Sequence, residues 1–187
     1  MTANGSQQRG HQLLERCKQR NAQAQKQLFE QYFGLLLGIG LRYTNDREEA
    51  KDLLQEAFVK IFKRIETLAH ASQLENWMKR IMINTAIDRY RSQVSEPWIQ
   101  DIDQVNEPSE PEQASQNLTQ EELLHLIQTL PNGYRTIFNL YAIEGYSHKE
   151  IADTFEITEG TSKSQLARAR HMLQVKVREY LANPHNE

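Results

Sequence analysis

The sequence is poor in the residues that build disulfide frameworks and membrane spans. Cys17 is the only cysteine among 187 residues, which excludes disulfides and thiolate metal clusters within one chain. The longest apolar stretch, residues 35–41, contains two glycines and falls short of the roughly 20 residues that a membrane-spanning helix needs. The first ten residues lack the apolar segment of a secretion signal. We therefore expect a cytoplasmic protein without stable membrane insertion.

Basic residues are missing from the middle of the chain. Residues 92–134 hold eight acidic residues and no lysine or arginine, whereas residues 1–91 carry a net charge of +5 and residues 135–187 are neutral. Residues 160–178 nevertheless hold five basic residues and no acid. Because salt screens charges beyond about 10 Å, such a local cluster can attract phosphates in a chain whose total charge is −3.

Apolar residues recur at helical spacing through residues 11–91, where glycine and proline are sparse. We predict that Asn45 caps one helix, whose first turn holds Glu48 and Glu49. Its buried side follows the i, i+3, i+4, i+7 pattern and comprises Ala50, Leu53, Leu54, Ala57, Phe58, Ile61, Phe62 and Ile65. A second helix is predicted over residues 74–91, with Trp77, Met78, Ile81, Met82, Ala86 and Ile87 buried.

Residues 92–117 differ from the rest in composition. They contain three of the five prolines, many serines, glutamines and asparagines, and scattered acids, which is typical of a flexible linker. Helical signals resume at Leu118, with capping-box patterns at Thr119 and Ser147. No strand pattern stands out. The sequence thus predicts an all-α fold of two small helical domains, residues 1–91 and 118–187, joined by an acidic linker over residues 92–117.

Residues 147–170, SHKEIADTFEITEGTSKSQLARAR, have the pattern of a helix-turn-helix. Ala152 is small where the second helix must approach the first, Ile157 packs from the turn, and Thr158 can cap the second helix. Helical geometry places one set of side chains on the inner face of the second helix, namely Ser162, Leu166, Ala169 and Leu173. The opposite face is predicted to be exposed and comprises Thr161, Ser164, Gln165 and Arg168.

The side chains of this predicted outer face suit the major groove of DNA. Gln165 can pair with adenine, Arg168 with guanine, and the hydroxyl groups with either base. Lys163, Arg170 and His171 flank the face and can reach phosphates. The alternative is an ordinary amphipathic helix pair with a solvated basic face. We favour DNA binding because the cap, the small residue, the turn and the basic face coincide.

Three segments resemble one family of transcription factors. Residues 130–170, LPNGYRTIFNLYAIEGYSHKEIADTFEITEGTSKSQLARAR, resemble region 4 of the extracytoplasmic-function (ECF) sigma factors. NDREEAKDLLQEAFVKIFKRI and NWMKRIMINTAIDRYRS resemble parts of region 2. The resemblance covers about residues 20–91 and 118–178, in the order of the family. Ser162 stands where the family usually has valine, and we expect it to weaken packing by about 1 kcal/mol or to bond a backbone carbonyl. Gln165 replaces the usual arginine.

The resemblance implies a sigma factor that binds core RNA polymerase, at the clamp coiled coil and the flap, and that recognises and melts promoter DNA. It implies a core-binding stripe at Asp52, Gln55, Glu56 and Val59, which without the resemblance would be an ordinary solvated face. It places downstream promoter contacts at Leu68, Trp77, Arg80, Asn84 and Arg91, where a satisfied surface asparagine is the plain alternative for Asn84. It places upstream promoter contacts at Thr161, Lys163, Ser164, Gln165 and Arg168. An anti-sigma protein is an implied partner, and the linker is either a tether or an acidic segment for the polymerase cleft.

Two other classes of protein remain to be distinguished from a sigma factor. A stand-alone helix-turn-helix regulator would share the C-terminal motif but leaves residues 20–91 unexplained. An enzyme would need a nucleophile, a general base or metal ligands at a defined spacing, and neither His148 with Glu150 nor Cys17 with His11 has one. No phosphate-binding glycine loop is present. We therefore expect no catalytic residues, no metal and no cofactor.

Overall fold

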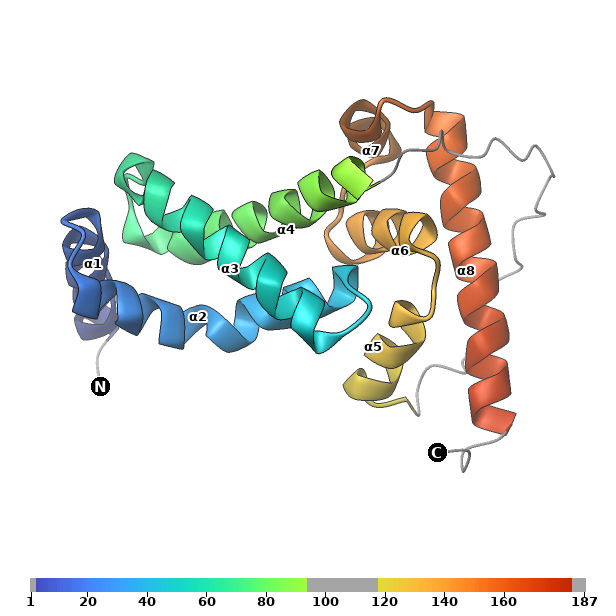
Figure 1. Ribbon diagram of the computed structural model, residues 1–187, viewed down its shortest axis with the longest axis horizontal. Coiled ribbons are helices and arrows are strands. Elements are labelled where there is room, and N and C mark those ends of the chain that lie inside the picture. Colours follow the sequence, from blue (N-terminus) through green and yellow to red (C-terminus); the bar gives the residue numbers. More distant parts are fainter. Residues whose placement is uncertain (1–2, 94–117, 183–187) are drawn as a thin grey trace. The chain divides into compact units, whose positions relative to one another are not determined.

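The computed structural model describes residues 3–93 and 118–182 (Figure 1). Within these ranges the chain forms helices and turns and no strand, which confirms the predicted all-α fold. None of the helices described is long and apolar enough to cross a membrane. The predicted linker begins inside a helix that continues to Gln93, and its remainder, residues 94–117, lies outside the described residues.

Two compact units make up the chain, Met1–Leu41 with Asp46–Arg89 and Arg42–Asn45 with Tyr90–Glu187. The first part of the chain forms α1 (Ala3–Lys18), α2 (Ala22–Tyr43), α3 (Arg47–Arg64) and α4 (Leu74–Gln93), with the short 3-10 helices η1 (Ile65–Thr67) and η2 (Ala71–Gln73) before α4. The second part forms α5 (Gln120–Gln128), α6 (Asn132–Phe138), a π-helical turn η4 (Asn139–Ile143), α7 (His148–Phe155) and α8 (Glu159–Ala182).

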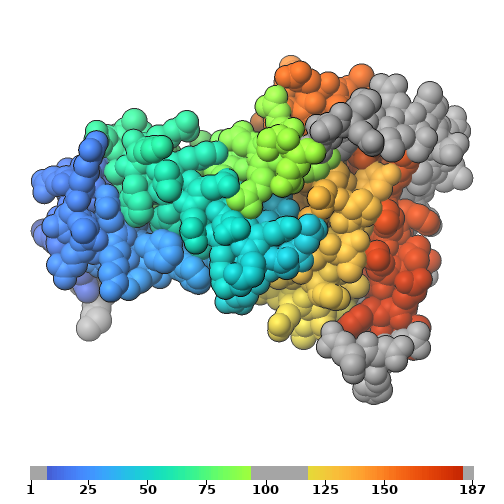
Figure 2. Space-filling model, in the orientation of Figure 1, coloured from blue at the N-terminus to red at the C-terminus, as the bar shows by residue number. Residues whose placement is uncertain are grey.

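The core of the first unit lies where α2, α3 and α4 pack together. Most of the predicted buried side of α3 is buried, with Leu53, Ala57 and Ile61 fully enclosed, and Phe62 is half-buried. Burying each large aliphatic side chain contributes about 1.5–3 kcal/mol. On α4 the predicted residues from Met78 to Ile87 are buried and Trp77 is half-buried. In the space-filling view, atoms of α2, α3 and α4 make up much of the visible surface of this unit (Figure 2).

Helix α3 begins one residue later than the sequence pattern suggested. The prediction that Asn45 caps it is wrong, because Asp46 has the extended backbone of an N-cap, with φ −145° and ψ 178°. The Asp46 carboxylate accepts hydrogen bonds from the backbone amides of Glu48 at 2.8 Å and Glu49 at 2.9 Å. Both Asn and Asp favour this position, so residue type alone could not choose between neighbours.

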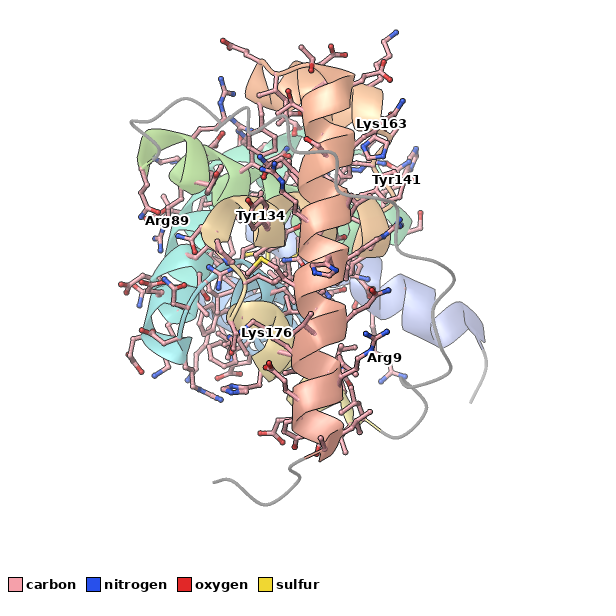
Figure 3. All side chains as sticks on the ribbon, turned by 90° about the vertical axis from the view of Figure 1, so that its right-hand side faces the viewer. Arg9, Arg89, Tyr134, Tyr141, Lys163 and Lys176 are labelled. Carbon is pink, nitrogen blue, oxygen red and sulfur yellow. The ribbon has the colours of Figure 1, made fainter. Side chains whose placement is uncertain are left out.

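The second unit is organised around α8, which contacts α5, α6 and α7 (Figure 3). Its main apolar cluster joins α5 to the inner face of α8 and comprises Leu126, Ile127, Leu130, Ala169 and Leu173. The half-buried side chains of Tyr134 and Phe138 pack against this cluster from α6. The core therefore fixes which side of α8 faces inward, and with it which side is left for a partner.

Gly40 marks a close approach of three helices in the first unit, α2, α3 and α4. A β-carbon at this position would lie 2.8 Å from the terminal methyl group of Met82 and 3.3 Å from the carbonyl oxygen of Ala50. Gly38, on the same helix, has no atom within 4 Å of the corresponding position. A side chain at position 40 would therefore meet other helices, whereas a side chain at position 38 would meet nothing, although the two glycines are only two residues apart.

We expect Gly40→Ala and Gly38→Ala to change stability in opposite directions. Gly38→Ala should stabilise the chain by about 0.5–1 kcal/mol, because alanine is the better helix former. Gly40→Ala should destabilise it by about 1 kcal/mol, because overpacking, which typically costs about 1–3 kcal/mol, exceeds that gain. Urea unfolding followed by circular dichroism measures both. Equal stabilisation by the two substitutions would show that the packing at Gly40 is not tight.

Candidate nucleic-acid interface

The first helix of the helix-turn-helix, α7, begins with a complete capping box. The Ser147 hydroxyl accepts a hydrogen bond from the Glu150 amide at 3.2 Å, and the Glu150 carboxylate accepts one from the Ser147 amide at 2.8 Å. The bond from the Ser147 amide to the carboxylate, followed by one that the Ser147 hydroxyl donates to it at 2.7 Å, lowers the pKa of Glu150. The predicted box is confirmed, and it fixes the start of α7 within the turn that follows η4.

A second capping box ties the two ends of this unit together. The Thr119 amide donates to the Glu122 carboxylate at 2.6 Å, and the Glu122 amide donates to the Thr119 hydroxyl at 3.3 Å. The Tyr180 hydroxyl, near the end of α8, donates to the same carboxylate at 2.6 Å. The Tyr180 hydrogen bond, followed by those from Thr119, lowers the pKa of Glu122. The start of α5 is thereby anchored to the end of α8.

The turn between α7 and α8 sets the angle of the second helix. Glu156 adopts the left-handed conformation, with φ 57° and ψ 40°, and so ends α7. The Ile157 amide then donates to the Ala152 carbonyl at 3.1 Å, and Ala152 itself is buried. The Thr158 hydroxyl accepts from the Thr161 amide at 3.0 Å, so the predicted cap of α8 is confirmed.

The inner face of α8 is as predicted, but the outer face differs at one residue. Ser162, Leu166, Ala169 and Leu173 are all buried. Gln165 was expected to be exposed and is only 5 % exposed, so the predicted position of its side chain is wrong. At 100° per residue it lies beside the stripe that runs through Ser162 and Leu166, close enough to share its burial.

The exposed part of α8 is centred on its basic side chains. Lys163, Arg170 and His171 are exposed, whereas Thr161, Ser164 and Arg168 are half-buried. Figure 3 shows Lys163 and Tyr141 on the same side of α8. Compared with the expected face, the surface left for a partner is shifted from Gln165 toward Lys163 and Arg170.

A group of interacting side chains, which we call the His148 cluster, joins η4, α7 and α8. It consists of Tyr141, His148, Ser162 and Arg170. The His148 ring stacks on Tyr141, with ring centroids 4.4 Å apart, and its Nδ1 lies 2.9 Å from the Ser162 hydroxyl oxygen. The Arg170 guanidinium lies 5.7 Å from the Tyr141 ring centroid. Burial, followed by the charge of Lys163, lowers the pKa of His148.

The His148 cluster explains the departure of Ser162 from the family pattern. Ser162 was expected either to weaken the packing or to bond a backbone carbonyl, and the structure gives its hydroxyl a side-chain partner 14 residues earlier. Tyr141 and His148 were absent from the residues predicted for the interface. The buried serine was the only signal for them, and no local pattern in the sequence identifies its partner.

The stripe predicted for core binding lies on the surface of α3. Asp52, Gln55 and Glu56 are exposed, and Val59 is 53 % exposed, which is high for an apolar side chain. Glu56 forms an ion pair with Arg89 of α4, and Arg89 also donates to the Glu49 carbonyl at 3.2 Å. The stripe therefore combines two carboxylates with an apolar residue, and α4 restrains one of the carboxylates.

The stripe predicted for downstream DNA lies along α4. Arg80, Asn84 and Arg91 are exposed and Trp77 is half-buried. Lys60 of α3 is paired with Asp88, which follows Asn84 by one turn, at 2.9 Å. Leu68 is only 5 % exposed, so its side chain is buried, and its contact with DNA stays a prediction. Its amide donates to the Ile65 carbonyl at 3.2 Å, and its apolar side chain closes the core after η1.

No group of three or more histidine, cysteine, aspartate or glutamate side chains is arranged to hold a metal ion in residues 3–93 and 118–182. Cys17 is buried, and burial raises the pKa of its thiol. A buried, protonated thiol is a weak nucleophile.

The sequence matches two family models and is similar to several sigma factors along most of its length. The family model described as Sigma-70 region 2 matches residues 28–96, and that described as Sigma-70, region 4 matches residues 120–173. RNA polymerase sigma-H factor of Pseudomonas aeruginosa is 30% identical over 180 residues, which cover 90% of this chain and 93% of the relative. ECF RNA polymerase sigma-E factor of Haemophilus influenzae is 28% identical over 88% of this chain and 93% of the relative. ECF RNA polymerase sigma factor SigM of Bacillus subtilis is 30% identical over 79% of this chain and 91% of the relative.

Two solved structures are similar in outline. Sigma factor RpoE, crystallised with the anti-sigma factor NepR from Bartonella quintana, is 24% identical, with a TM-score of 0.49 over 82% of this chain and 96% of that chain. CnrH, in complex with the cytosolic domain of CnrY, is 20% identical, with a TM-score of 0.44 over 89% of this chain and 96% of that chain.

The class that the two matched regions define is the sigma-70 family of DNA-binding transcription initiation factors. Within that family, the chain belongs to the ECF RNA polymerase sigma factors. The resemblance seen in the sequence is thus confirmed.

We expect the interaction between Ser162 and His148 to appear in a double-mutant cycle. Ser162→Val, which introduces the usual residue of the family, should cost about 1 kcal/mol more in the wild-type background than in an H148F background, because it removes the hydrogen-bond partner of the imidazole. Phenylalanine at position 148 retains a ring to stack on Tyr141. Urea unfolding of the four proteins measures the coupling, and strictly additive effects would contradict it.

Proposed function

We propose that this chain binds core RNA polymerase and directs initiation at specific promoters by recognising an upstream (−35) and a downstream (−10) element and melting the DNA. The observation that carries the proposal is the presence of both sigma-70 regions, in order, in one chain. A stand-alone helix-turn-helix regulator has no use for region 2. Bond chemistry is left to the polymerase, and we assign no cofactor and no catalytic residue to this chain.

For the polymerase, we propose the α3 stripe of Asp52, Gln55, Glu56 and Val59 as the contact with the clamp coiled coil. An exposed valine among carboxylates supplies a small apolar patch that loses its water when a partner covers it, surrounded by charged side chains. This arrangement gives orientation and fast association as well as affinity. Their exposure supports this assignment. We further propose that the second part of the chain meets the polymerase flap.

For the downstream element, we propose the exposed stripe of α4. Arg80 and Arg91 supply positive charge for the backbone, independent of base sequence. Asn84 carries both a donor and an acceptor and is suited to an unstacked base, and Trp77 offers an aromatic surface beside it. The exposure of the three polar residues supports this role. Leu68, which is buried, supports the stripe from the core and is not proposed as a contact.

For the upstream element, we propose that α8 enters the major groove. Lys163 reaches the backbone, and Thr161, Ser164 and Arg168 lie on the flank of the helix that turns toward the bases. Gln165, buried at the edge of the inner face, acts by holding the helix and meets DNA only if its side chain turns outward.

We also propose that the protein acts in the cytoplasm, that an anti-sigma protein controls it, and that the acidic linker enters the polymerase cleft.

Promoter-dependent transcription tests the function as a whole. Purified core polymerase with this chain should start transcripts at defined sites on genomic DNA of the source organism, whereas core alone should not. Asp52→Arg should abolish this activity and the capture of core in a pull-down, because it puts a cation into the acidic stripe. Glu30→Arg, which also reverses an exposed acid but lies on α2, is the matched control. Unchanged core capture by the Asp52→Arg protein would refute the assignment of the stripe.

Asn84→Ala should separate melting from duplex binding. We expect open-complex formation to fall about tenfold or more, as for the loss of one good base contact, while binding of the holoenzyme to duplex DNA changes little. Permanganate reactivity of thymines measures melting, and a gel-shift assay measures binding. An equal loss in both assays would show that Asn84 contributes to general DNA affinity and not to the melted strand.

A further inference from the structure

The His148 cluster lies at the joint between the two helices of the helix-turn-helix. His148 is the first residue of α7, and its ring is held on one side by Tyr141 of η4 and at Nδ1 by Ser162 of α8. It is half-buried, so part of the ring remains accessible to solvent. The ring is therefore fixed in orientation by three elements and is still able to meet a ligand from outside.

The charges that face His148 are mainly positive. From α8, Lys163 and Arg170 oppose protonation of the ring, and Glu159 favours it. From η4 the ring meets the neutral phenol of Tyr141, and on α7 the nearby Glu150 is engaged in the capping box. Glu159 is itself shared with Lys163, at 4.0 Å. The three charged groups that act on the ring, Lys163, Arg170 and Glu159, leave a charge of about +1 around it, opposite to the charge of a DNA phosphate diester.

We propose that the His148 cluster binds a backbone phosphate of DNA, and that His148 takes up a proton as the phosphate arrives. The inference rests on the proposed function, since it assumes that α8 meets DNA. In the protonated imidazole both nitrogens donate, so Nδ1 donates to the Ser162 hydroxyl and Nε2 donates to a phosphate oxygen. Lys163 and Arg170 share the same anion. No covalent bond changes, and solvent supplies the proton.

The direction of the pH dependence follows from linkage. In the free protein the pKa of His148 is lowered by burial and by Lys163, and a phosphate beside the ring raises it again. Because the bound state holds the proton more tightly, DNA affinity is highest at pH values below the free pKa. It falls as the pH rises from the free to the bound pKa and then levels off. Each unit between the two pKa values is worth up to about tenfold in affinity.

DNA binding by the full chain across pH tests the proposal. The probe is a short mixed-sequence duplex with a pH-insensitive rhodamine label, titrated by fluorescence anisotropy at constant ionic strength from about pH 5.5 to about pH 8. We expect the wild-type chain to bind about threefold to tenfold more weakly at the upper end of the range. The H148Q chain, whose amide can still bond Ser162 but does not titrate, should show a much flatter dependence. H125Q, at an exposed histidine of α5, is the matched control and should behave as wild type.

If H148Q folds poorly, an NMR titration of His148 in the wild-type chain tests the proposal directly. The ring resonance of His148, assigned through its contact with Tyr141, is followed by NMR with and without the duplex, and its midpoint should move to higher pH in the complex. An unchanged midpoint, full pH dependence in H148Q, or no binding by wild type at any pH would overturn the proposal. The proposed function is judged separately by promoter-dependent transcription, so the proton linkage can fail while the initiation activity stands.

Discussion

The burial of one apolar stripe on each helix is the constraint on which the rest of the molecule depends. In the second unit, Leu166, Ala169 and Leu173 on α8 can be covered only if that side of the helix faces α5 and α6. Because Lys163 and Arg170 lie on the other side of α8, this orientation of the helix is enough to expose them. The candidate interface is in this sense the part of the helix that the core does not use, and any change that rotates α8 alters both at once.

Helix positions and caps could be predicted because they depend on nearby residues. The stripes on α3, α4 and α8 and both capping boxes are patterns of three or four residues, and the structure contains them. The errors fall where two local choices are nearly equal. Asn45 and Asp46 both favour an N-cap, and Gln165 lies at the edge of a buried stripe, where a small rotation decides exposure.

Contacts between segments far apart in the sequence could not be predicted from local sequence patterns. Nothing in the residues next to Leu68 in the sequence indicates that its side chain is buried. The partnership of Ser162 with His148 spans a turn and a helix, and that of Tyr180 with Glu122 spans most of the second unit. The residue types of the interface were accessible to sequence reasoning, whereas the second layer that holds them in place was not.

The close approach at Gly40 has a consequence for which substitutions this chain can accept. Three positions on three helices share one small volume, namely Gly40, the backbone at Ala50 and the flexible end of Met82. A side chain at position 40 needs the end of Met82 to move or to become shorter, whereas the Ala50 carbonyl, which belongs to the backbone of α3, sets a limit that position 82 does not change. The residue at position 82 therefore affects how much a substitution at position 40 costs, and we expect substitutions at the two positions to be non-additive.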